Sequence, residues 1–355
     1  MLLFAFILAL IFGAVTHKTR FCAMGALADF VYFRDLTRIR IWVIAVAIAI
    51  IGFNLMVGFG WIVAAKSIYA QSELTWLSLI GGGVLFGWGM VLAGGCGSQN
   101  LIKLGTGNLK ALVVLGAMAF SALSTLYGWL AVLNEQWIGL FSVNLRLSQD
   151  IPSLLSYWFA LPSTTLAPWV GASLGLILLI WVLLAAEGRM LKNWLAGISI
   201  GGLVLSYWWL SGVWGYVPEH PETLQEAFLG TRNNRMESFS LVAPVAYGMD
   251  LLMYFSDQSR LLTMSILTVP GIVCGAAVMA LKSASFKWQG FTSVEDLVRH
   301  LLGGLMMGAG GVMALGCTLG QGLSGISTLS IGSFLAVLGM VLGGIGALKY
   351  QEANN

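Results

Sequence analysis

Two glycine-rich turns, each built around a cysteine, are the parts of this 355-residue sequence whose residue types could do chemistry. The first reads LAGGCGSQNLIKLGTG over 92–107 and contains Cys96, and the second reads ALGCTLGQGLSG over 314–325 and contains Cys317. Each turn follows an apolar run and leads into small polar residues. A thiol is a weak donor and its sulfur a weak acceptor. Such groups can hold a ligand briefly and release it.

The glycines beside both cysteines predict that each helix breaks at its cysteine. Glycine accepts tight turns and lets a ligand or another backbone approach closely. At membrane depth, irregular backbone is tolerated only where it is buried in protein or lines a cavity. Half-helices that meet there would direct free N–H groups and partial positive charge at an anion. The residues expected to support the two turns are Gly94, Gly95, Gly97, Gln99, Gly316, Gly320 and Gln321.

Two other glycine pairs have a different interpretation. Gly83 with Gly87, and Gly304 with Gly308, are spaced four residues apart in apolar runs. This spacing lets two membrane helices pack closely, so we expect close packing there rather than a pore turn.

The remaining two cysteines lie in different settings. Cys22 opens a short apolar segment after basic residues, TRFCAMGALADF over 19–30, and Asp29 in this segment is the carboxylate that we expect to lie deepest. Cys274 lies within an apolar run, where a free cysteine commonly serves as a small buried hydrophobe. The four cysteines form no CxxC pair and no metal-ligand spacing, so neither a metal nor a cofactor is expected.

The composition indicates an all-α integral membrane protein that forms a single transmembrane domain over 1–355. Hydrophobic residues make up 58% of the chain and charged residues 9%, against about a quarter in soluble domains. A soluble protein of this size would need more charge to keep its surface hydrated. The net charge of +3 is too small to suggest nucleic acid.

Nine apolar stretches can serve as membrane-spanning helices, which need about 20 residues or somewhat fewer. Four further segments, 16–40, 96–110, 232–256 and 317–330, are apolar and small-residue-rich but too irregular for a full span, so we expect short re-entrant helices. Segment 132–165 predicts an outer loop with an interfacial piece. The nine predicted spans are about 1–15, 41–57, 78–95, 111–131, 166–186, 194–212, 261–281, 298–316 and 331–348.

The basic residues favour an outside N-terminus and an inside C-terminus, because lysine and arginine concentrate in cytoplasmic loops. With that orientation, most of the 18 Lys and Arg residues lie inside. The exceptions, which lie outside, are Lys66, Arg146, Arg232, Arg235 and Arg260.

The two cysteine turns belong to an internal repeat. Laying 82–96 on 303–317 gives eight identities without a gap, ending on Cys96 and Cys317. A weaker upstream match at an offset of 215 pairs Thr16 with Thr231 and sets Cys22 opposite Glu237. We predict repeat one over about 1–131, a connector over 132–212 and repeat two over about 213–348.

An odd number of predicted spans separates equivalent positions, so the two repeats are expected to be inverted in the membrane. Inverted repeats are typical of transporters, which bind their substrate near the midplane at the repeat interface.

The three segments RFCAMGALADF, LAGGCGSQNL and LGCTLGQGLSG resemble the cysteine motifs of the YeeE/YedE family, and the resemblance covers roughly 10–122 and 225–348. These are bacterial membrane proteins of thiosulfate uptake and, for some members, of selenium metabolism. The resemblance implies an hourglass of nine spans and shorter helices in the bacterial inner membrane. It also implies that Cys22, Cys96 and Cys317 line a thiosulfate path, and that a cytoplasmic TusA-like sulfur carrier is a partner.

Transport through such a path would need neutral thiols, since a thiolate repels a dianion. Arg20 and Arg235 are candidates for attracting the anion, although loop cations often serve only to set topology. The open alternatives are a related anion such as sulfite or selenite, and a membrane-embedded sulfurtransferase that forms a cysteine persulfide. The second alternative needs a base beside a thiol, and neither His17, His220 nor His300 has a clear cysteine partner. We therefore expect a transporter and not an enzyme.

Overall fold

The computed structural model describes residues 1–133, 141–145, 147–219, 224–257 and 262–354. These residues are mostly helical, with two small antiparallel ribbons, β1 (Glu73–Leu74) with β2 (Val143–Asn144) and β3 (Tyr216–Val217) with β4 (Ala227–Phe228). The sequence predictions that concern Arg146, His220 and Arg260 lie outside the described residues.

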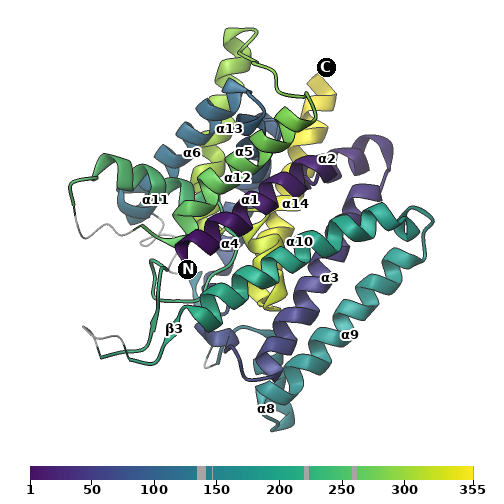
Figure 1. Ribbon diagram of the computed structural model, residues 1–355, viewed down its shortest axis with the longest axis vertical. Helices are drawn as coiled ribbons and strands as arrows, with labels where there is room; N and C mark the ends of the chain where they lie inside the picture. Colours follow the sequence, from purple (N-terminus) through teal and green to yellow (C-terminus); the bar gives the residue numbers. More distant parts are fainter. Residues whose placement is uncertain (134–140, 146, 220–223, 258–261, 355) are drawn as a thin grey trace.

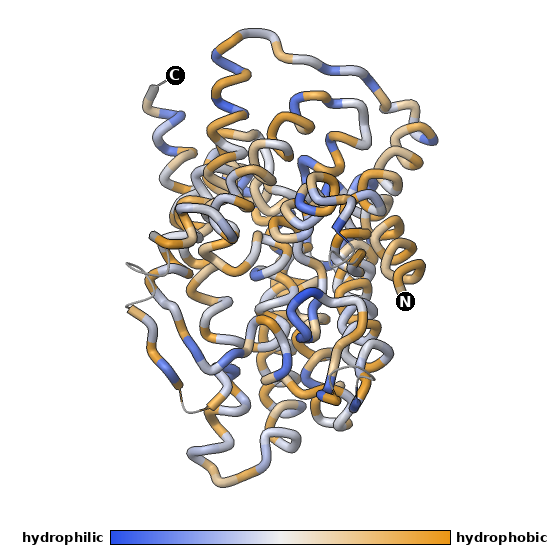
Figure 2. Tube along the Cα trace, turned by 90° about the vertical axis from the view of Figure 1, so that its left-hand side faces the viewer, coloured by the Kyte–Doolittle hydropathy of each residue, from blue (hydrophilic) through white to orange (hydrophobic). Residues whose placement is uncertain are grey.

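Eight helical stretches in the described part of the chain are long and apolar enough to cross a membrane, which confirms the all-α membrane fold. Figure 2 shows that hydrophobic residues follow these helices and that the most hydrophilic residues lie largely in their connections. The helices in these stretches are α1 (Leu2–Thr19), α3 (Thr37–Gly58), α4 (Trp76–Leu92), α6 (Leu109–Tyr127), α9 (Ser163–Leu183), α10 (Leu191–Trp209), α12 (Met264–Lys282) and α14 (Ile331–Asn354).

The predicted span at 298–316 corresponds to α13 (Val294–Met313), which is not among these eight apolar stretches. Its first two turns hold Glu295, Asp296, Arg299 and His300, which make it more polar than the others. The helix nevertheless has 20 residues and packs between α4 and α6. The apolar part of α13 therefore faces other helices, and its charged start lies at one end of the bundle.

Short helices occupy the four segments that were expected to be re-entrant. They include α2 (Ala23–Ala28), the short π-helix η1 (Asp29–Phe33), α5 (Gly97–Gly105), α11 (Val242–Met253) and the short π-helix η7 (Gly320–Gly325). None of these pieces is long enough to span a bilayer alone. The other short helices are η2 (Ala64–Lys66), α7 (Trp129–Leu133), α8 (Ile151–Phe159), η5 (Glu187–Arg189) and η6 (Leu210–Trp214).

Helix α8 has the character expected of an interfacial piece in the 132–165 segment. Tyr157, Trp158 and Phe159 at its end are strongly exposed. Tryptophan and tyrosine favour the boundary between lipid and water. The exposed aromatic end thus suits a position at the membrane surface.

The long helices pack in related pairs (Figure 1). Helix α1 packs on α12 and α10 packs on α3, while α4 packs on α14 and α13 packs on α6. Helices α4 and α13 also contact each other, and this central contact lets the turns that follow them meet.

Glycines make the central contacts possible. A Cβ atom at Gly83 or Gly87 of α4 would overlap backbone atoms of α14, and one at Gly304 or Gly308 of α13 would overlap backbone atoms of α6. These glycines thus pack helices closely, as their spacing predicts.

We predict that Gly87→Ala lowers the melting temperature of the detergent-solubilised protein, because its methyl group would overlap the Met340 carbonyl of α14. Overpacking of this kind typically costs about 1–3 kcal/mol. Gly81→Ala on the same helix is the matched control, since its methyl group would meet open space. Equal melting temperatures for the two variants would contradict this account of the helix contact.

Candidate functional site

The chain turns sharply after α4 and restarts as α5 at Cys96. Gly94 has a φ of +65°, which a glycine adopts without strain, and the Gly95 N–H donates to the Met90 carbonyl at 2.8 Å. The Asn100 amide donates to the carbonyls of Gly95 and Cys96 at 2.9 and 3.1 Å. The Asn100 side chain thus provides a donor for the Gly95 carbonyl, which the helix break leaves without a backbone partner.

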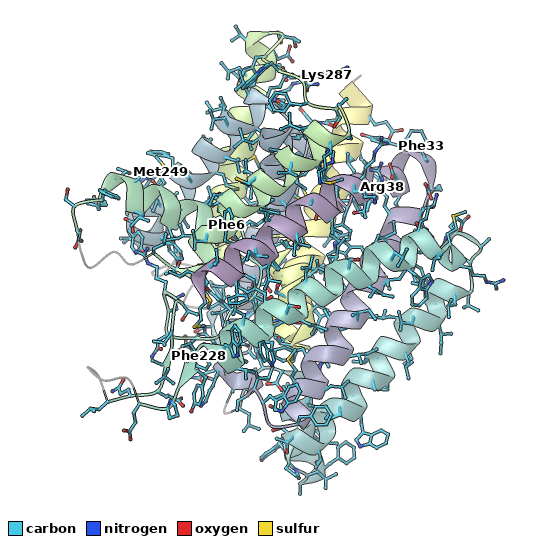
Figure 3. All side chains as sticks on the ribbon, viewed as in Figure 1. Phe6, Phe33, Arg38, Phe228, Met249 and Lys287 are labelled. Carbon is cyan, nitrogen blue, oxygen red and sulfur yellow. The ribbon has the colours of Figure 1, made fainter. Side chains whose placement is uncertain are left out.

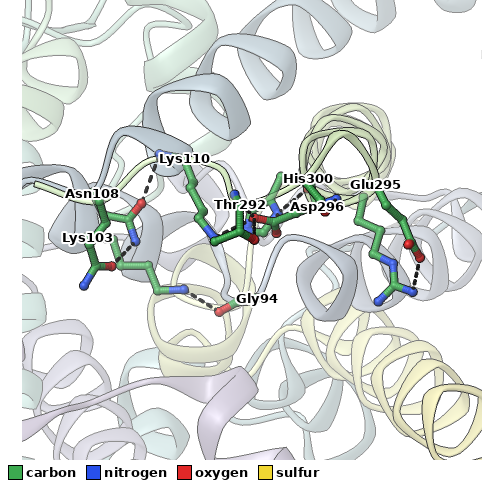
Figure 4. A network of polar contacts seen from close by, with 11 residues as sticks. Gly94, Lys103, Asn108, Lys110, Thr292, Glu295, Asp296 and His300 are labelled. Atoms are coloured by element: carbon green, nitrogen blue, oxygen red, sulfur yellow. Dashed lines mark hydrogen bonds and ion pairs between the residues drawn. The ribbon is translucent and has the colours of Figure 1, made fainter. Parts of the chain in front are cut away.

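Lys103 adds a further bond to this turn. Its ammonium donates to the Gly94 carbonyl at 2.7 Å (Figure 4). A nearby ion pair between Lys110 and Asp296, at 2.6 Å, joins the start of α6 to the start of α13. The turn is thus held by side chains that lie after it in the sequence.

The turn after α13 repeats this construction. Leu315 takes the left-handed conformation with a φ of +54°, and the Gly316 N–H donates to the Gly311 carbonyl at 2.8 Å. The Gln321 amide donates to the Ala314 carbonyl at 2.6 Å, and the Gly320 N–H points at the Cys317 sulfur, 3.4 Å away. A side-chain amide four residues after each cysteine therefore closes each turn.

The predicted glycines do not all need to be glycine. A Cβ atom at Gly97 would make only ordinary contacts, of 3.8 Å or more. One at Gly95 would press on Gln99 at 3.1 Å, and one at Gly320 would lie 3.0 Å from the Ser240 hydroxyl. A Cβ atom at Gly316 would likewise lie 3.1 Å from the Gln321 side chain. Gly94, Gly95, Gly316 and Gly320 are therefore the positions where the turn geometry restricts the side chain.

Three cysteines come together where the two turns meet. Cys22 is half-buried at the start of α2, and its sulfur accepts from the Gly25 N–H at 3.3 Å. The Cys96 sulfur lies 3.2 Å from the Ser98 hydroxyl, and Cys22 and Cys317 are both close enough to Cys96 to interact with it electrostatically. Cys96 and Cys317 are each only 1% exposed. The structure thus gathers the three predicted cysteines.

The fourth cysteine corrects a sequence prediction. Cys274 was expected to be a buried core residue, but it is exposed on the outer surface of α12. An apolar run does not reveal which of its residues faces lipid and which faces protein. Cys274 lies away from the cavities described next.

A large basic cavity opens beside Cys22. It has a volume of about 720 Å³, and Gly94 and Gln99 also line it. We call it the basic cavity after its basic lining residues, His17, Lys18, Arg20, Arg38 and Lys103. Arg20 was predicted as an anion-attracting residue, whereas Arg38 was not singled out.

Asp29 is not the deep carboxylate that was expected. Its side chain is 23% exposed and pairs with Arg38 at 3.1 Å. Its charge is thus largely balanced by a cation at the edge of the basic cavity.

A smaller cavity lies on the other side of the cysteines. It has a volume of about 160 Å³ and borders Gly316, directly before Cys317. We call it the Glu237 cavity, and Ser240, Tyr247 and Ser265 also line it. In the sequence, Glu237 stands out only as the counterpart of Cys22.

Arg235 does not reach the cysteines. It lines a separate surface depression of about 630 Å³ with Lys66 and Glu226, which form an ion pair. Figure 3 shows Arg38 at the upper right of the molecule and Phe228 at the lower left. The Arg235 depression, which Phe228 also lines, is therefore far from the basic cavity.

The model of a family described as "Sulphur transport" matches residues 18–346, which include all four cysteines. The chain belongs to the Sulphur transport family. Among relatives, the thiosulfate transporter TsuA of Spirochaeta thermophila is 26% identical over 343 residues, which cover 94% of each chain. The thiosulfate transporter TsuA of Escherichia coli is 23% identical over 366 residues, covering 97% of this chain and 92% of its own.

The basic residues around the cavity of this Sulphur transport family member should affect how fast charged thiol reagents modify Cys22. We expect a negatively charged methanethiosulfonate reagent to modify Cys22 about 10-fold or more faster than a positively charged one, because the lining cations attract anions. Labelling is followed by mass spectrometry of membranes, with Cys22→Ala as the negative control and Cys274→Ala as the matched control that leaves labelling unchanged. Equal rates for the two reagents would contradict the electrostatic account of this cavity.

Proposed function

We propose that this protein takes up thiosulfate across the bacterial inner membrane, as a transporter rather than an enzyme. The observation that carries the proposal is the convergence of Cys22, Cys96 and Cys317 between two cavities, in a chain whose full-length relatives are named thiosulfate transporters. The anion passes between the Glu237 cavity and the basic cavity, along the three thiols.

The chemistry of the site suits a soft dianion. The cations of the basic cavity attract negative charge. The thiols offer weak hydrogen bonds, and conduction needs sites that bind weakly enough to release. The backbone N–H groups that open α5 at Cys96 add partial positive charge. Together these groups accept the anion without trapping it.

Sidedness follows from the orientation proposed from the charges. With the N-terminus outside, the basic cavity faces the cytoplasm and the Glu237 cavity faces outward. The residues predicted to lie inside, such as Arg20 and Lys103, share one cavity, while Lys66 and Arg235 share a depression elsewhere. This separation supports the orientation. A cytoplasmic TusA-like carrier, as the family resemblance implies, would then meet the intact anion at the mouth of the basic cavity.

The packing pairs support an inverted repeat. We take α1 as the counterpart of α10, α3 of α12, α4 of α13 and α6 of α14. The packed pair α1 and α12 then corresponds to the pair α10 and α3, and the pair α4 and α14 corresponds to the pair α13 and α6. The short helices follow the same exchange, since α2 contacts α14 and α11 contacts α6. This correspondence favours starting repeat two near Leu191, at α10, rather than near 213. The single helix α9 then connects two four-span repeats, which places them in opposite orientations.

Uptake of labelled thiosulfate by cells that lack other thiosulfate importers tests the proposed function. We expect Cys22→Ala, Cys96→Ala and Cys317→Ala each to reduce uptake about 10-fold or more at matched membrane expression, because each removes one thiol from the path. Cys274→Ala is the matched control and keeps wild-type uptake, since Cys274 is exposed on α12. Normal uptake by all variants would contradict the thiol path.

Competition by unlabelled anions tests the cargo in the same cells. Unlabelled thiosulfate should compete most effectively with the labelled ion. Stronger competition by sulfite or selenite would show that this anion, and not thiosulfate, is the preferred substrate. A stable persulfide on one cysteine would instead favour a sulfurtransferase.

A further inference from the structure

Glu237 is a half-buried residue at the wall of the Glu237 cavity, and the thiol path does not use its carboxyl group. It lies outside the spanning helices, in the coil before α11, between the fully buried residues Met236 and Ser238. Its Oε1 atom is enclosed by protein and has no hydrogen-bond partner. A carboxylate in such a place is costly, because burial disfavours the charged form.

The groups that face Glu237 offer little compensation for a negative charge. The titratable neighbours are phenols, namely Tyr69 from the loop after η2, Tyr207 of α10 and Tyr247 of α11. Among the described residues, no lysine, arginine or histidine forms an ion pair with Glu237. Burial raises the pKa of the Glu237 carboxyl to about 7, with the Ser265 hydroxyl acting in the opposite direction.

The position of Glu237 connects it to the cysteines. It lines the small cavity that reaches Gly316, next to Cys317. Tyr69 faces both Glu237 and Cys317, and its hydroxyl lies beside Gly320 of η7. The sequence match at an offset of 215 residues also sets Glu237 opposite Cys22. An anion that moves from this cavity to Cys317 therefore passes the Glu237 carboxyl.

We propose that Glu237 is a proton-binding site of the outward cavity, and that the thiosulfate dianion enters only while this carboxyl is protonated. The inference rests on the proposed function. A proton from the outer solution converts the carboxylate into a neutral acid, which removes the repulsion and leaves an O–H that can donate to the anion. By linkage, a bound anion must in turn strengthen proton binding.

The first test compares uptake at different outer pH values. Wild-type uptake should fall about 10-fold as the pH rises from 6 to 8 through the value of about 7. Glu237→Gln keeps the shape but cannot ionise, so its uptake should stay near the acidic wild-type rate throughout. The backbone contacts are retained in this variant, because the Ser211 and Ser324 hydroxyls donate to the carbonyls of residues 237 and 239. Glu219→Gln, an exposed carboxyl away from the cavities, is the matched control and should titrate like wild type.

A second test follows the proton without transport. Infrared difference spectra of the purified protein should show a carboxylic acid band that titrates near neutral pH, is missing in Glu237→Gln and remains in Glu219→Gln. Adding thiosulfate should move this titration to higher pH.

The two tests separate the inference from the proposed function. Wild-type pH dependence that persists in Glu237→Gln, or the absence of such a band, overturns the role of Glu237 while thiosulfate uptake stands. If the Glu237 band titrates but the protein takes up no thiosulfate, the substrate assignment is wrong. Glu237 would then be shown only to bind a proton.

Discussion

The arrangement depends on one constraint, which is that two helices stop inside the bundle and their free carbonyl groups must still find donors. In a membrane interior an unpaired backbone group is costly. Asn100 and Gln321 supply the donors at the two turns, and Lys103 supplies a third. Because the donors are side chains of the restarting segments, each cysteine is held at a fixed point between a helix that ends and one that begins.

The central helices explain why the two turns meet. Glycines on α4 and α13 allow backbone contact with each other and with α14 and α6. Such close approach leaves little room for a wide channel, so access is limited to a cavity on each side of the thiols. The cavities differ in character, with cations around one and a carboxyl and hydroxyls around the other. An anion that moves from the Glu237 cavity to the basic cavity therefore moves toward positive charge.

The lengths of the hydrophobic stretches were enough to predict most of the membrane-spanning helices. The glycines that flank Cys96 and Cys317 were enough to predict both turns. The roles of Asn100, Arg38 and Glu237 were not foreseen, because a polar residue in an apolar sequence does not reveal whether it caps a turn, pairs with a neighbour or faces a cavity. Asp29 shows the opposite error, since its partner Arg38 follows nine residues later on another helix. Cys274 shows that an apolar run hides which side of its helix faces lipid. These errors concern contacts between elements, which one sequence does not contain.

If the proposed path is correct, the anion contacts the thiols between the two cavities. A structure of the protein with bound thiosulfate, with the sulfur atoms located by anomalous scattering, would show this contact. We expect a ligand sulfur within hydrogen-bonding distance of the Cys96 thiol, and its loss in Cys96→Ala with the fold unchanged. Thiosulfate bound only in the Arg235 depression, with the cysteines untouched in both proteins, would contradict it.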